Sequence, residues 1–443
     1  MEFPYRFGIE EEYFVTDART RRVRQTMSEK FYVDCKMALG DIVKREALQA
    51  QIEIAIPPCA SLAEAREHLT RCRKALGECA ARYRLAIVAA GTHPLAVWTE
   101  QRQTPKARYD LYMADVQMLG LRNMLCGMHV HVEVPDPSRR VEIMTRTLPY
   151  LPALLALSAS SPFWQGRRTG LHAYRPAAYD ELPRTGLPEL FNSTEEYELF
   201  VRTLMQAGVI KDASFIWWSI RPSMRYPTLE LRICDVCPRV DDALCIAAIY
   251  RCLIRYLVDH PEVNRDIGPL DRALVAENKW RAQRDGHQAT LVDHVTLQTR
   301  TLAATIEDLL AALRETAEVL GCVQEIEHAR MIVEQGTSAA EQCQVYLLAR
   351  AAGESRPAAL KRVVDYLART TGSYSESVAR QEPLAGRLAR GIATGGRGRF
   401  AIPRARPCAP RWALMRRDFL SGYRIAFRCE RDSRRPSDYW QPG

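Results

Sequence analysis

Acidic, histidine and amide side chains occur at every second position in four segments of this sequence. The polar positions are Glu10 and Glu12 in the first segment, Gln49, Gln51 and Glu53 in the second, His129, His131 and Glu133 in the third, and Thr228, Glu230 and Arg232 in the fourth. The residues between them are mostly apolar. Because successive side chains of a β-strand point to opposite faces, residues two apart project together. The pattern predicts four strands, each with a polar and an apolar face.

A sheet with one solvent-facing side would produce the same alternation, and this alternative explains any one strand taken alone. It explains the set less well, because the four faces concentrate Glu and His and contain no Lys. Carboxylates packed this closely require a compensating cation. Magnesium prefers carboxylates, water and phosphate oxygens, whereas zinc favours more His and Cys ligands. We therefore expect a magnesium site, although His131 fits a hydrogen-bonding role at the edge of the core equally well.

Arg232 follows Glu230 on the same predicted face and supplies a planar group suited to phosphate or carboxylate. Asp235 is a weaker candidate and is equally explained as a helix or turn cap. Cys234 and Cys237 form the one CxxC motif, but no second cysteine pair or histidine pair completes a zinc site. The sequence contains neither a P-loop motif nor a GxGxxG motif after a strand. Nucleotide binding, if present, would therefore use a sheet and a metal.

The elements that must position these residues follow from hydrophobic periodicity and turn signals. We expect strands over 5–16, 48–56, 85–90 and 128–134, and two strand-like runs within 214–234. Helices are expected from Ser61, whose segment fits a capping box, and over 107–121, 138–160, 239–259, 269–283, 299–319, 338–352 and 356–370. Strands and helices mix early and helices dominate later, which indicates an α+β fold. Residues 161–194 are rich in loops and are expected to pass over the site.

The net charge of +9 resides in one end of the chain. From Arg387 onward there are 14 Arg, no Lys and 4 acidic residues, so the rest of the chain is nearly neutral. A neutral body lacks the basic surface that binds a phosphate backbone, and we do not expect nucleic acid as a partner. Residues 386–443 are interpreted as an Arg-rich, poorly ordered extension of a catalytic domain over 1–385.

The sequence gives no indication of membrane insertion or secretion. No segment approaches the ~18 consecutive apolar residues that a membrane-spanning helix requires. The first residues lack the basic and then apolar pattern of a secretory signal. We therefore expect a cytoplasmic protein with no membrane partner, whose 13 cysteines are mostly reduced.

Five segments together resemble the type 2 glutamate–cysteine ligase family, carboxylate–amine ligases of the glutamine-synthetase-like superfamily. They are FGIEEEYFV at 7–15, QIEIAIPP at 51–58, CGMHVHVEVPD at 126–136, RPSMRYPTLELRICDVCPRVDDAL at 221–244, and ENKWRAQRDG at 277–286. The resemblance implies a curved antiparallel sheet with Mg²⁺ and ATP on its polar face and a helical second half. It also implies that a carboxylate, usually the side chain of glutamate, is converted to an acyl phosphate and transferred to an amine such as that of cysteine. A homodimer is a further expectation from the resemblance.

The resemblance also implies roles for individual residues. The metal-binding residues it implies are Glu10, Glu12, Glu53, His129 and Glu230. Glu53, Glu230 and Arg232 are implied to be catalytic. The nucleotide or substrate contacts it implies are Arg232, Arg221, Asn278 and Arg281. For Arg281, a surface charge on a helix is an equally good interpretation.

One position departs from the family pattern. Ser219 stands where relatives have an acidic residue just before the Arg-Pro-Ser segment. This departure and the Arg-rich extension motivate an alternative, a non-catalytic protein that binds Mg-ATP or an amino acid. The residues select neither the carboxylate nor the amine.

Overall fold

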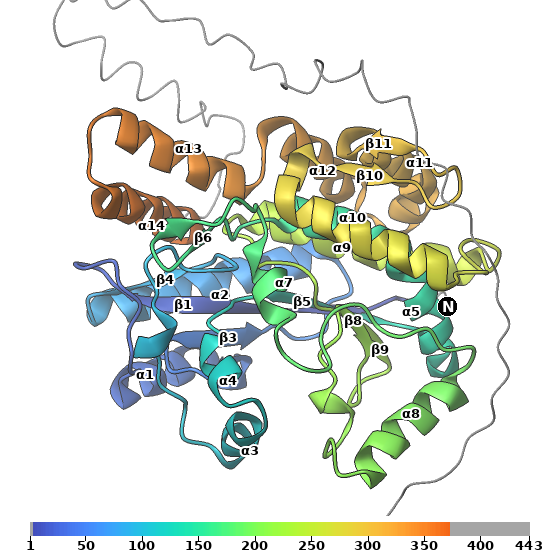
Figure 1. The fold of residues 1–443 in the computed structure, drawn as a ribbon, viewed down its shortest axis with the longest axis horizontal. Coiled ribbons are helices and arrows are strands. Elements are labelled where there is room, and N and C mark those ends of the chain that lie inside the picture. The colour runs from blue at the N-terminus through green and yellow to red at the C-terminus, as the bar shows by residue number, and fades with distance from the viewer. Residues whose placement is uncertain (1–2, 373–443) are drawn as a thin grey trace, which may run out of the picture. The chain divides into compact units, whose positions relative to one another are not determined.

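Residues 3–372 are described by the computed structural model, and a seven-stranded antiparallel sheet lies at their centre (Figure 1). Its strands are β1 (Phe7–Asp17), β2 (Val43–Arg45), β3 (Gln51–Ala55), β4 (Leu85–Val88), β5 (Met128–Glu133), β8 (Ile220–Pro222) and β9 (Thr228–Leu231). The order is β2-β3-β1-β5-β9-β8, and β4 pairs with the end of β1. β1 spans 11 residues, so β5 and then β4 pair with it in succession along one edge. The predicted antiparallel sheet is confirmed.

The register of the sheet brings the predicted polar positions together. Glu12 lies opposite Glu53, Glu10 lies opposite His129, and Glu230 lies between His131 and Arg221 on its two neighbouring strands. The opposite face is apolar and buried, and it includes Ile9, Tyr13, Ile52, Ile54, Val130, Val132, Leu229 and Leu231. Burial of this face fixes the register, because a slip of one residue would move every apolar side chain to the polar face of the sheet.

Gln49 is an exception to the predicted pattern. β3 begins at Gln51, and Gln49 lies in the preceding turn. Its side chain accepts a hydrogen bond from the Met27 N–H at 3.2 Å and donates one to the Gln103 carbonyl at 2.9 Å. Gln49 therefore ties two loops together and does not contribute to the polar face.

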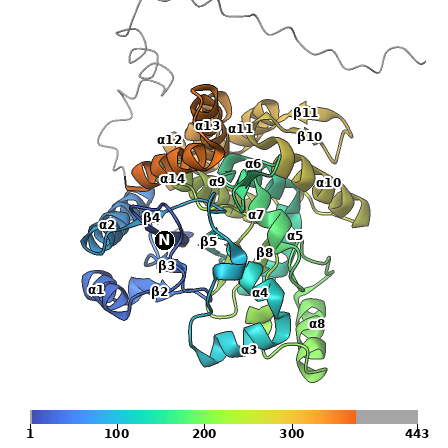
Figure 2. The same cartoon turned by 60° about the vertical axis from the view of Figure 1, so that its left-hand side comes forward.

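Helices cover the apolar face, and the second half of the described chain is almost entirely helical. The helices are α1 (Glu29–Leu39), α2 (Leu62–Arg82), α3 (Ala107–Val116), α4 (Met118–Arg122), α5 (Arg140–Thr147), α6 (Leu151–Ser158), α7 (Tyr174–Tyr179), α8 (Thr194–Gln206), α9 (Val240–Asp259), α10 (Pro269–Asp285), α11 (Leu302–Leu320), α12 (Val323–Gln335), α13 (Ser338–Ala351) and α14 (Arg356–Gly372). In Figures 1 and 2 the helices from α9 onward lie on one side of the sheet, whereas α3, α4 and α8 lie toward the other. Two small two-stranded sheets, β6 (Phe163–Trp164) with β7 (Arg167–Arg168) and β10 (Thr290–Val292) with β11 (Thr299–Thr301), complete the described fold.

Most predicted helices are confirmed to within a few residues, but α1, α7, α8 and α12 were not predicted. α12 buries only the narrow stripe Ile326, Ala329 and Ile332, which gives a weak periodic signal. The predicted helix over 138–160 is divided at Leu148–Tyr150, a 3₁₀ turn that contains a proline.

Beneath the polar face, a buried ion pair joins β1 to α2. Glu11 points to the apolar side of β1, where both its carboxylate oxygens accept hydrogen bonds from Arg73, at 2.6 and 3.0 Å. Both side chains are completely buried. Arg73 also donates to the carbonyls of Cys237 and Pro238, and the Tyr13 hydroxyl donates to Glu11. β1, α2 and the segment after β9 are therefore held together by one polar network.

Within residues 3–372, no helix has both the length and the apolar character needed to cross a membrane. The loop-rich stretch 161–194 contains β6, β7 and α7. The Arg-rich extension expected over 386–443, and the domain boundary before it, lie outside the described residues.

Candidate active site

The polar face of the sheet forms the floor of a cavity of about 1210 Å³. Other parts of its lining come from α3, from the loop carrying Asp212–Phe215, from the β8–β9 turn, and from α7. The expectation that the 161–194 stretch reaches the site is met by Arg175 and Tyr179 of α7. The lining contains carboxylates at its centre and several cationic side chains, a composition suited to anionic substrates together with metal ions.

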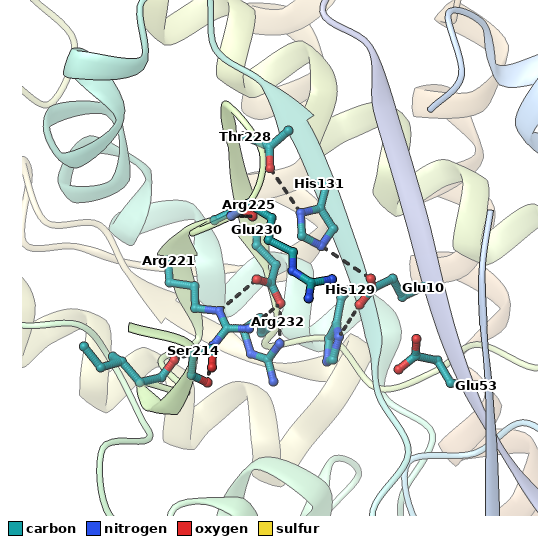
Figure 3. A network of polar contacts seen from close by, with 12 residues as sticks. Glu10, Glu53, His129, His131, Ser214, Arg221, Arg225, Thr228, Glu230 and Arg232 are labelled. Atoms are coloured by element: carbon teal, nitrogen blue, oxygen red, sulfur yellow. Dashed lines mark hydrogen bonds and ion pairs between the residues drawn. The ribbon is translucent and has the colours of Figure 1, made fainter. Parts of the chain in front are cut away.

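A first cluster of metal-ligating atoms combines Glu10, His131 and Glu230. One ligand atom from each lies within 4.8 Å of the other two. His131 Nε2 is 3.8 Å from Glu10 Oε1, and His131 Nδ1 is 3.1 Å from the Thr228 hydroxyl (Figure 3). His131 therefore belongs to the site, and its two ring nitrogens contact different partners.

His129 lies next to this cluster and keeps one nitrogen free. Its Nδ1 is 3.3 Å from Glu10 Oε2, whereas its buried Nε2 has no hydrogen-bond partner among the described residues. Burial, together with the nearby charge of Arg232, lowers the pKa of His129 to about 4, so the ring is neutral at pH 7. Since a carboxylate only accepts, Nδ1 carries the proton and Nε2 carries a lone pair. Metal-binding histidines commonly have this arrangement, with the second nitrogen donating to a carboxylate.

The hydrogen bond from His129 also acts on Glu10. Burial by itself would raise the pKa of Glu10, but this hydrogen bond and the nearby His131 and His129 lower it to about 2. Glu10 is therefore ionised at neutral pH and available as a metal ligand.

A second cluster combines Glu12, Glu46 and Glu53, again with one oxygen of each within 4.8 Å of the others. Burial raises the pKa of Glu12 to about 7, although Arg175 and a 2.6 Å hydrogen bond from the Gly127 N–H oppose this rise. Burial also raises the pKa of Glu46 well above its usual range, and the neighbouring charges of Glu53 and Glu12 add to this effect. Three carboxylates this close together form a site that a divalent cation would stabilise.

Glu46 was missed by sequence reasoning. It follows β2, a strand of three residues that produces no clear alternation. The pairing of β2 with β3 places Lys44 opposite Glu53 and brings Glu46 to the same end of the cavity. The Lys44 ammonium lies 3.0 Å from Glu53 and 3.9 Å from Glu10, so it partly neutralises the carboxylates of both clusters.

The residues of the two clusters fit magnesium. The two clusters consist of five carboxylates and one imidazole, and no cysteine is among them. The unpartnered Nε2 of His129 is an independent sign that a ligand belongs there, because a buried polar atom without a partner is costly. Glu10, Glu230 and the two histidines would hold one ion, and Glu12, Glu46 and Glu53 a second.

Two arginines bind the carboxylate of Glu230. Arg221 Nε lies 2.8 Å from one oxygen, and Arg232 forms an ion pair with the other. Burial would raise the pKa of Glu230, but the two guanidinium groups hold it well below its usual range. β9 ends at Leu231, so Arg232 lies one residue beyond the strand yet still faces Glu230. Its Nε has no partner and is free to donate to a ligand.

Comparison with known proteins identifies the family. A sequence model described as glutamate-cysteine ligase family 2 matches residues 6–365. The chain belongs to glutamate–cysteine ligase family 2. A relative from Bradyrhizobium sp. (strain ORS 278) is 48% identical over 344 residues, covering 77% of this chain and 83% of the relative. One from Rhodospirillum rubrum is 47% identical over 364 residues, covering 81% and 94%. Both carry the provisional name glutamate–cysteine ligase 2.

Solved structures of distant ligases share the fold. The glutamate–cysteine ligase of Francisella tularensis, in complex with AMP, matches with a TM-score of 0.60 at 12% identity, covering 85% of this chain and 91% of that chain. The bifunctional glutathione synthetase of Pasteurella multocida matches with a TM-score of 0.61 at 14% identity, covering 83% and 52%. The predicted α+β, glutamine-synthetase-like fold is confirmed. Family and fold support an ATP-dependent carboxylate–amine ligase.

Two residues that the family resemblance pointed to do not lie in the cavity. Asn278, on α10, donates to the Val292 carbonyl and accepts from the Val292 N–H, each at 2.7 Å, and so fixes β10. Arg281 is bound to Glu277 one turn earlier at 2.9 Å. Neither side chain lines the cavity. The structure therefore gives both residues contacts within the α10–β10 region and separates them from the other predicted site residues.

Ser219, the departure from the family pattern, lies directly behind Arg232. Its carbonyl accepts hydrogen bonds from the backbone N–H groups of Arg232 and Ile233 at 2.8 and 3.1 Å. The contacts are made by the backbone, which any residue supplies.

Arg175 is another residue that sequence reasoning missed. Its guanidinium donates to the carbonyls of Arg232 and Cys234 and packs against Gly127. A Cβ at Gly127 would lie 2.1 Å from Arg175 Nη2, so glycine is required there. Arg175 thus supports the segment that carries Arg232, and no motif in its loop indicated this.

Asp235 and the CxxC cysteines are buried structural residues. Asp235 accepts hydrogen bonds from the Ser160 N–H at 2.9 Å and the Ser161 hydroxyl at 2.7 Å. Burial raises the pKa of the Cys234 thiol to about 12 and that of Cys237 well above its usual range. Neither thiol is therefore disposed to bind a metal as a thiolate.

Proposed function

We propose that the protein is a magnesium- and ATP-dependent carboxylate–amine ligase that joins a carboxylate, such as the side chain of glutamate, to an amine such as that of cysteine. The observation that carries this proposal is the presence of two three-residue clusters of candidate metal ligands along one cavity, with two arginines beside one of them. Family membership supports the same reaction class.

In the proposed reaction, a carboxylate oxygen attacks the terminal phosphorus of ATP, the bond to the ADP oxygen breaks, and an acyl phosphate forms. The amine nitrogen then attacks the acyl carbon, inorganic phosphate leaves, and the nitrogen releases a proton. Bound magnesium would neutralise phosphate charge and align the phosphate oxygens for in-line transfer. The protein contributes chiefly position and charge.

Different residues of the cavity would bind metal ions and stabilise charge on the phosphate. The clusters Glu10/His131/Glu230 and Glu12/Glu46/Glu53 supply negative charge that would hold metal ions. His129 adds a neutral acceptor whose proton is fixed on the far nitrogen by Glu10. Arg232 offers a free Nε–H beside these groups, suited to an oxygen that gains charge during transfer.

The proposal is tested by incubating the full chain with ATP, MgCl₂, glutamate and a panel of amines. We expect ADP and phosphate to appear only when a carboxylate and an amine are both present, and mass spectrometry to show the amide product. Hydrolysis of ATP that is independent of the amine with every carboxylate would contradict a ligase. Tight Mg-ATP binding in calorimetry without turnover on any substrate pair would support the non-catalytic alternative instead.

A further inference from the structure

The tip of the β8–β9 hairpin holds one cationic side chain over the cavity. Ser223 accepts hydrogen bonds at its hydroxyl from the N–H groups of Arg225 and Tyr226, at 3.4 and 3.3 Å, and its own N–H donates to the Thr228 carbonyl at 3.0 Å. From α5, Arg140 Nη1 donates to the carbonyls of Ser223 and Tyr226 at 2.8 and 3.0 Å. The backbone on both sides of Arg225 is therefore held from within the turn and from a neighbouring helix.

The side chain of Arg225, in contrast, has no ionic partner. Among the described residues no carboxylate forms an ion pair with it, although it lines the cavity. Figure 3 shows its guanidinium directed from the turn toward the space beside Glu230 and the two histidines. The other two arginines of this hairpin region, Arg221 and Arg232, occupy both oxygens of Glu230.

This arrangement leaves the Arg225 guanidinium available to an anion from solution. A guanidinium next to a metal-binding cluster would be repelled by the bound cation unless an anionic group lay between them. A group with several oxygens can bind the metal ion with one oxygen and the guanidinium with another, and guanidinium binds phosphate in a bidentate manner. The polyphosphate of a nucleotide meets both requirements.

We propose that Arg225 binds the polyphosphate of the nucleotide above the Glu10/His131/Glu230 cluster. This inference rests on the proposed function, because it assumes that Mg-ATP enters the cavity. It adds Arg225 to the arginines that the sequence indicated. Hydrogen bonds from Ser223 and Arg140 hold the turn that carries this residue. Tyr226, whose ring meets His131 edge-on at 6.3 Å, positions the same turn against the cluster.

The test compares Arg225→Ala and Arg225→Lys with the full-length wild type by calorimetry of Mg-ATP binding, without carboxylate or amine. Loss of a bidentate, charge-assisted contact should weaken Mg-ATP binding about 10- to 100-fold in Arg225→Ala. Arg225→Lys should retain part of the affinity, because it keeps the charge and loses the planar fork. Binding of AMP, which lacks the polyphosphate, should change less than about 3-fold by the same argument.

Two control variants separate a local contact from other effects. Arg356→Ala and Lys361→Ala each remove an equal charge at an exposed position of α14, away from the cavity. Both should bind Mg-ATP as the wild type does. The thermal midpoint of Arg225→Ala should match that of the wild type, since the side chain is exposed and has no ionic partner among the described residues.

The possible results lead to different conclusions. If Arg225→Ala binds Mg-ATP within 2-fold of the wild type, the inference is wrong. This holds even if the Michaelis constant for the carboxylate rises, which would make Arg225 a carboxylate-binding residue. If the wild type itself does not bind Mg-ATP, the proposed function fails and the inference fails with it.

Discussion

The carboxylates of the cavity differ in what balances their charge. Glu230 is neutralised by two guanidinium groups, whereas Glu10 has the Lys44 ammonium 3.9 Å away and accepts a hydrogen bond from the neutral ring of His129. Among residues 3–372 neither Glu12 nor Glu46 forms an ion pair, and burial raises the pKa of both. The second cluster is therefore the part of the site that depends most on a bound cation. Glu53, which faces Glu12 across the strands and also contacts Lys44, connects this cluster to the rest of the cavity.

Glu53→Gln tests the second cluster with little change in size. We expect turnover to fall about 100-fold or more, as is common when a group that organises charge at a reacting centre is removed. The variant should remain folded, since the side chain of Glu53 points into the cavity and does not pack in the apolar core. Steady-state release of ADP over a range of MgCl₂ concentrations is the measurement. Glu307→Gln, an exposed carboxylate paired with Arg330 away from the cavity, is the matched control. Half or more of wild-type turnover in Glu53→Gln would contradict the assignment.

Lys44→Met tests whether the lysine competes with metal ions. Its ammonium lies between Glu53 and Glu10, where it screens carboxylates of both clusters. Without it, we expect magnesium to bind about 3- to 10-fold more tightly, because one repulsive charge at close range is lost. The metal-free variant should also unfold at a lower temperature. Calorimetric titration with MgCl₂ measures the first effect. Weaker magnesium binding in Lys44→Met would show that the lysine supports the site instead of competing for it.

At the scale of elements, the three consecutive glutamates of β1 serve both the cavity and the core. Glu10 and Glu12 project into the cavity, and Glu11 projects to the opposite side, where Arg73 of α2 binds it. The buried pair holds β1 against α2 and against the segment after β9. The rigidity of the strand that carries two candidate metal ligands thus depends on a contact made on its other face.

The Glu11–Arg73 pair is tested by a double-mutant cycle. Glu11→Gln and Arg73→Met should each lower the free energy of unfolding by about 3–5 kcal/mol, because each leaves the remaining partner buried without compensation. The double variant Glu11→Gln/Arg73→Met should be less destabilised than the sum of the two single changes. Urea unfolding at neutral pH measures all forms. Strict additivity would indicate that the pair does not act as a unit.

At the scale of the whole molecule, the charge of the protein and the charge of its site are separate. The positive charge is concentrated after Arg387, outside the described residues, whereas the cavity is lined by residues 6–232. Its raised carboxylate pKa values make the stability of the metal-free protein depend on pH.

The pH dependence of stability follows from Glu12. Its pKa is raised by burial from 4.5 to about 7 in the folded protein. Between these two values the folded state holds a proton that the unfolded chain has released, so the free energy of unfolding falls as pH rises through this window. Glu46, raised in the same direction, adds to the fall. In chelator-treated protein, Glu12→Gln should therefore gain stability relative to the wild type as pH increases from 5 to 8.

Thermal unfolding of the two proteins at several pH values measures this difference. Effects of other groups, such as His129 with its lowered pKa, are present in both proteins and largely cancel. A difference that stays constant from pH 5 to pH 8 would show that Glu12 does not carry the raised pKa. Added MgCl₂ should stabilise the wild type more at pH 8 than at pH 6, because metal binding requires the ionised carboxylates.

The sequence by itself determined the strands, their polar faces and the helical second half, because these follow from local periodicity. It also indicated Glu10, Glu12, Glu53, His129, Glu230 and Arg232, which the structure places around one cavity. Only the tertiary structure decided which carboxylates form a cluster, since pairing between distant strands sets the register. It added Glu46, Lys44 and Arg175 from short or irregular segments without a periodic signal. It also separated Asn278 and Arg281 from the cavity. A sequence motif shows that these residues lie on α10, but it does not show toward which part of the fold their side chains point.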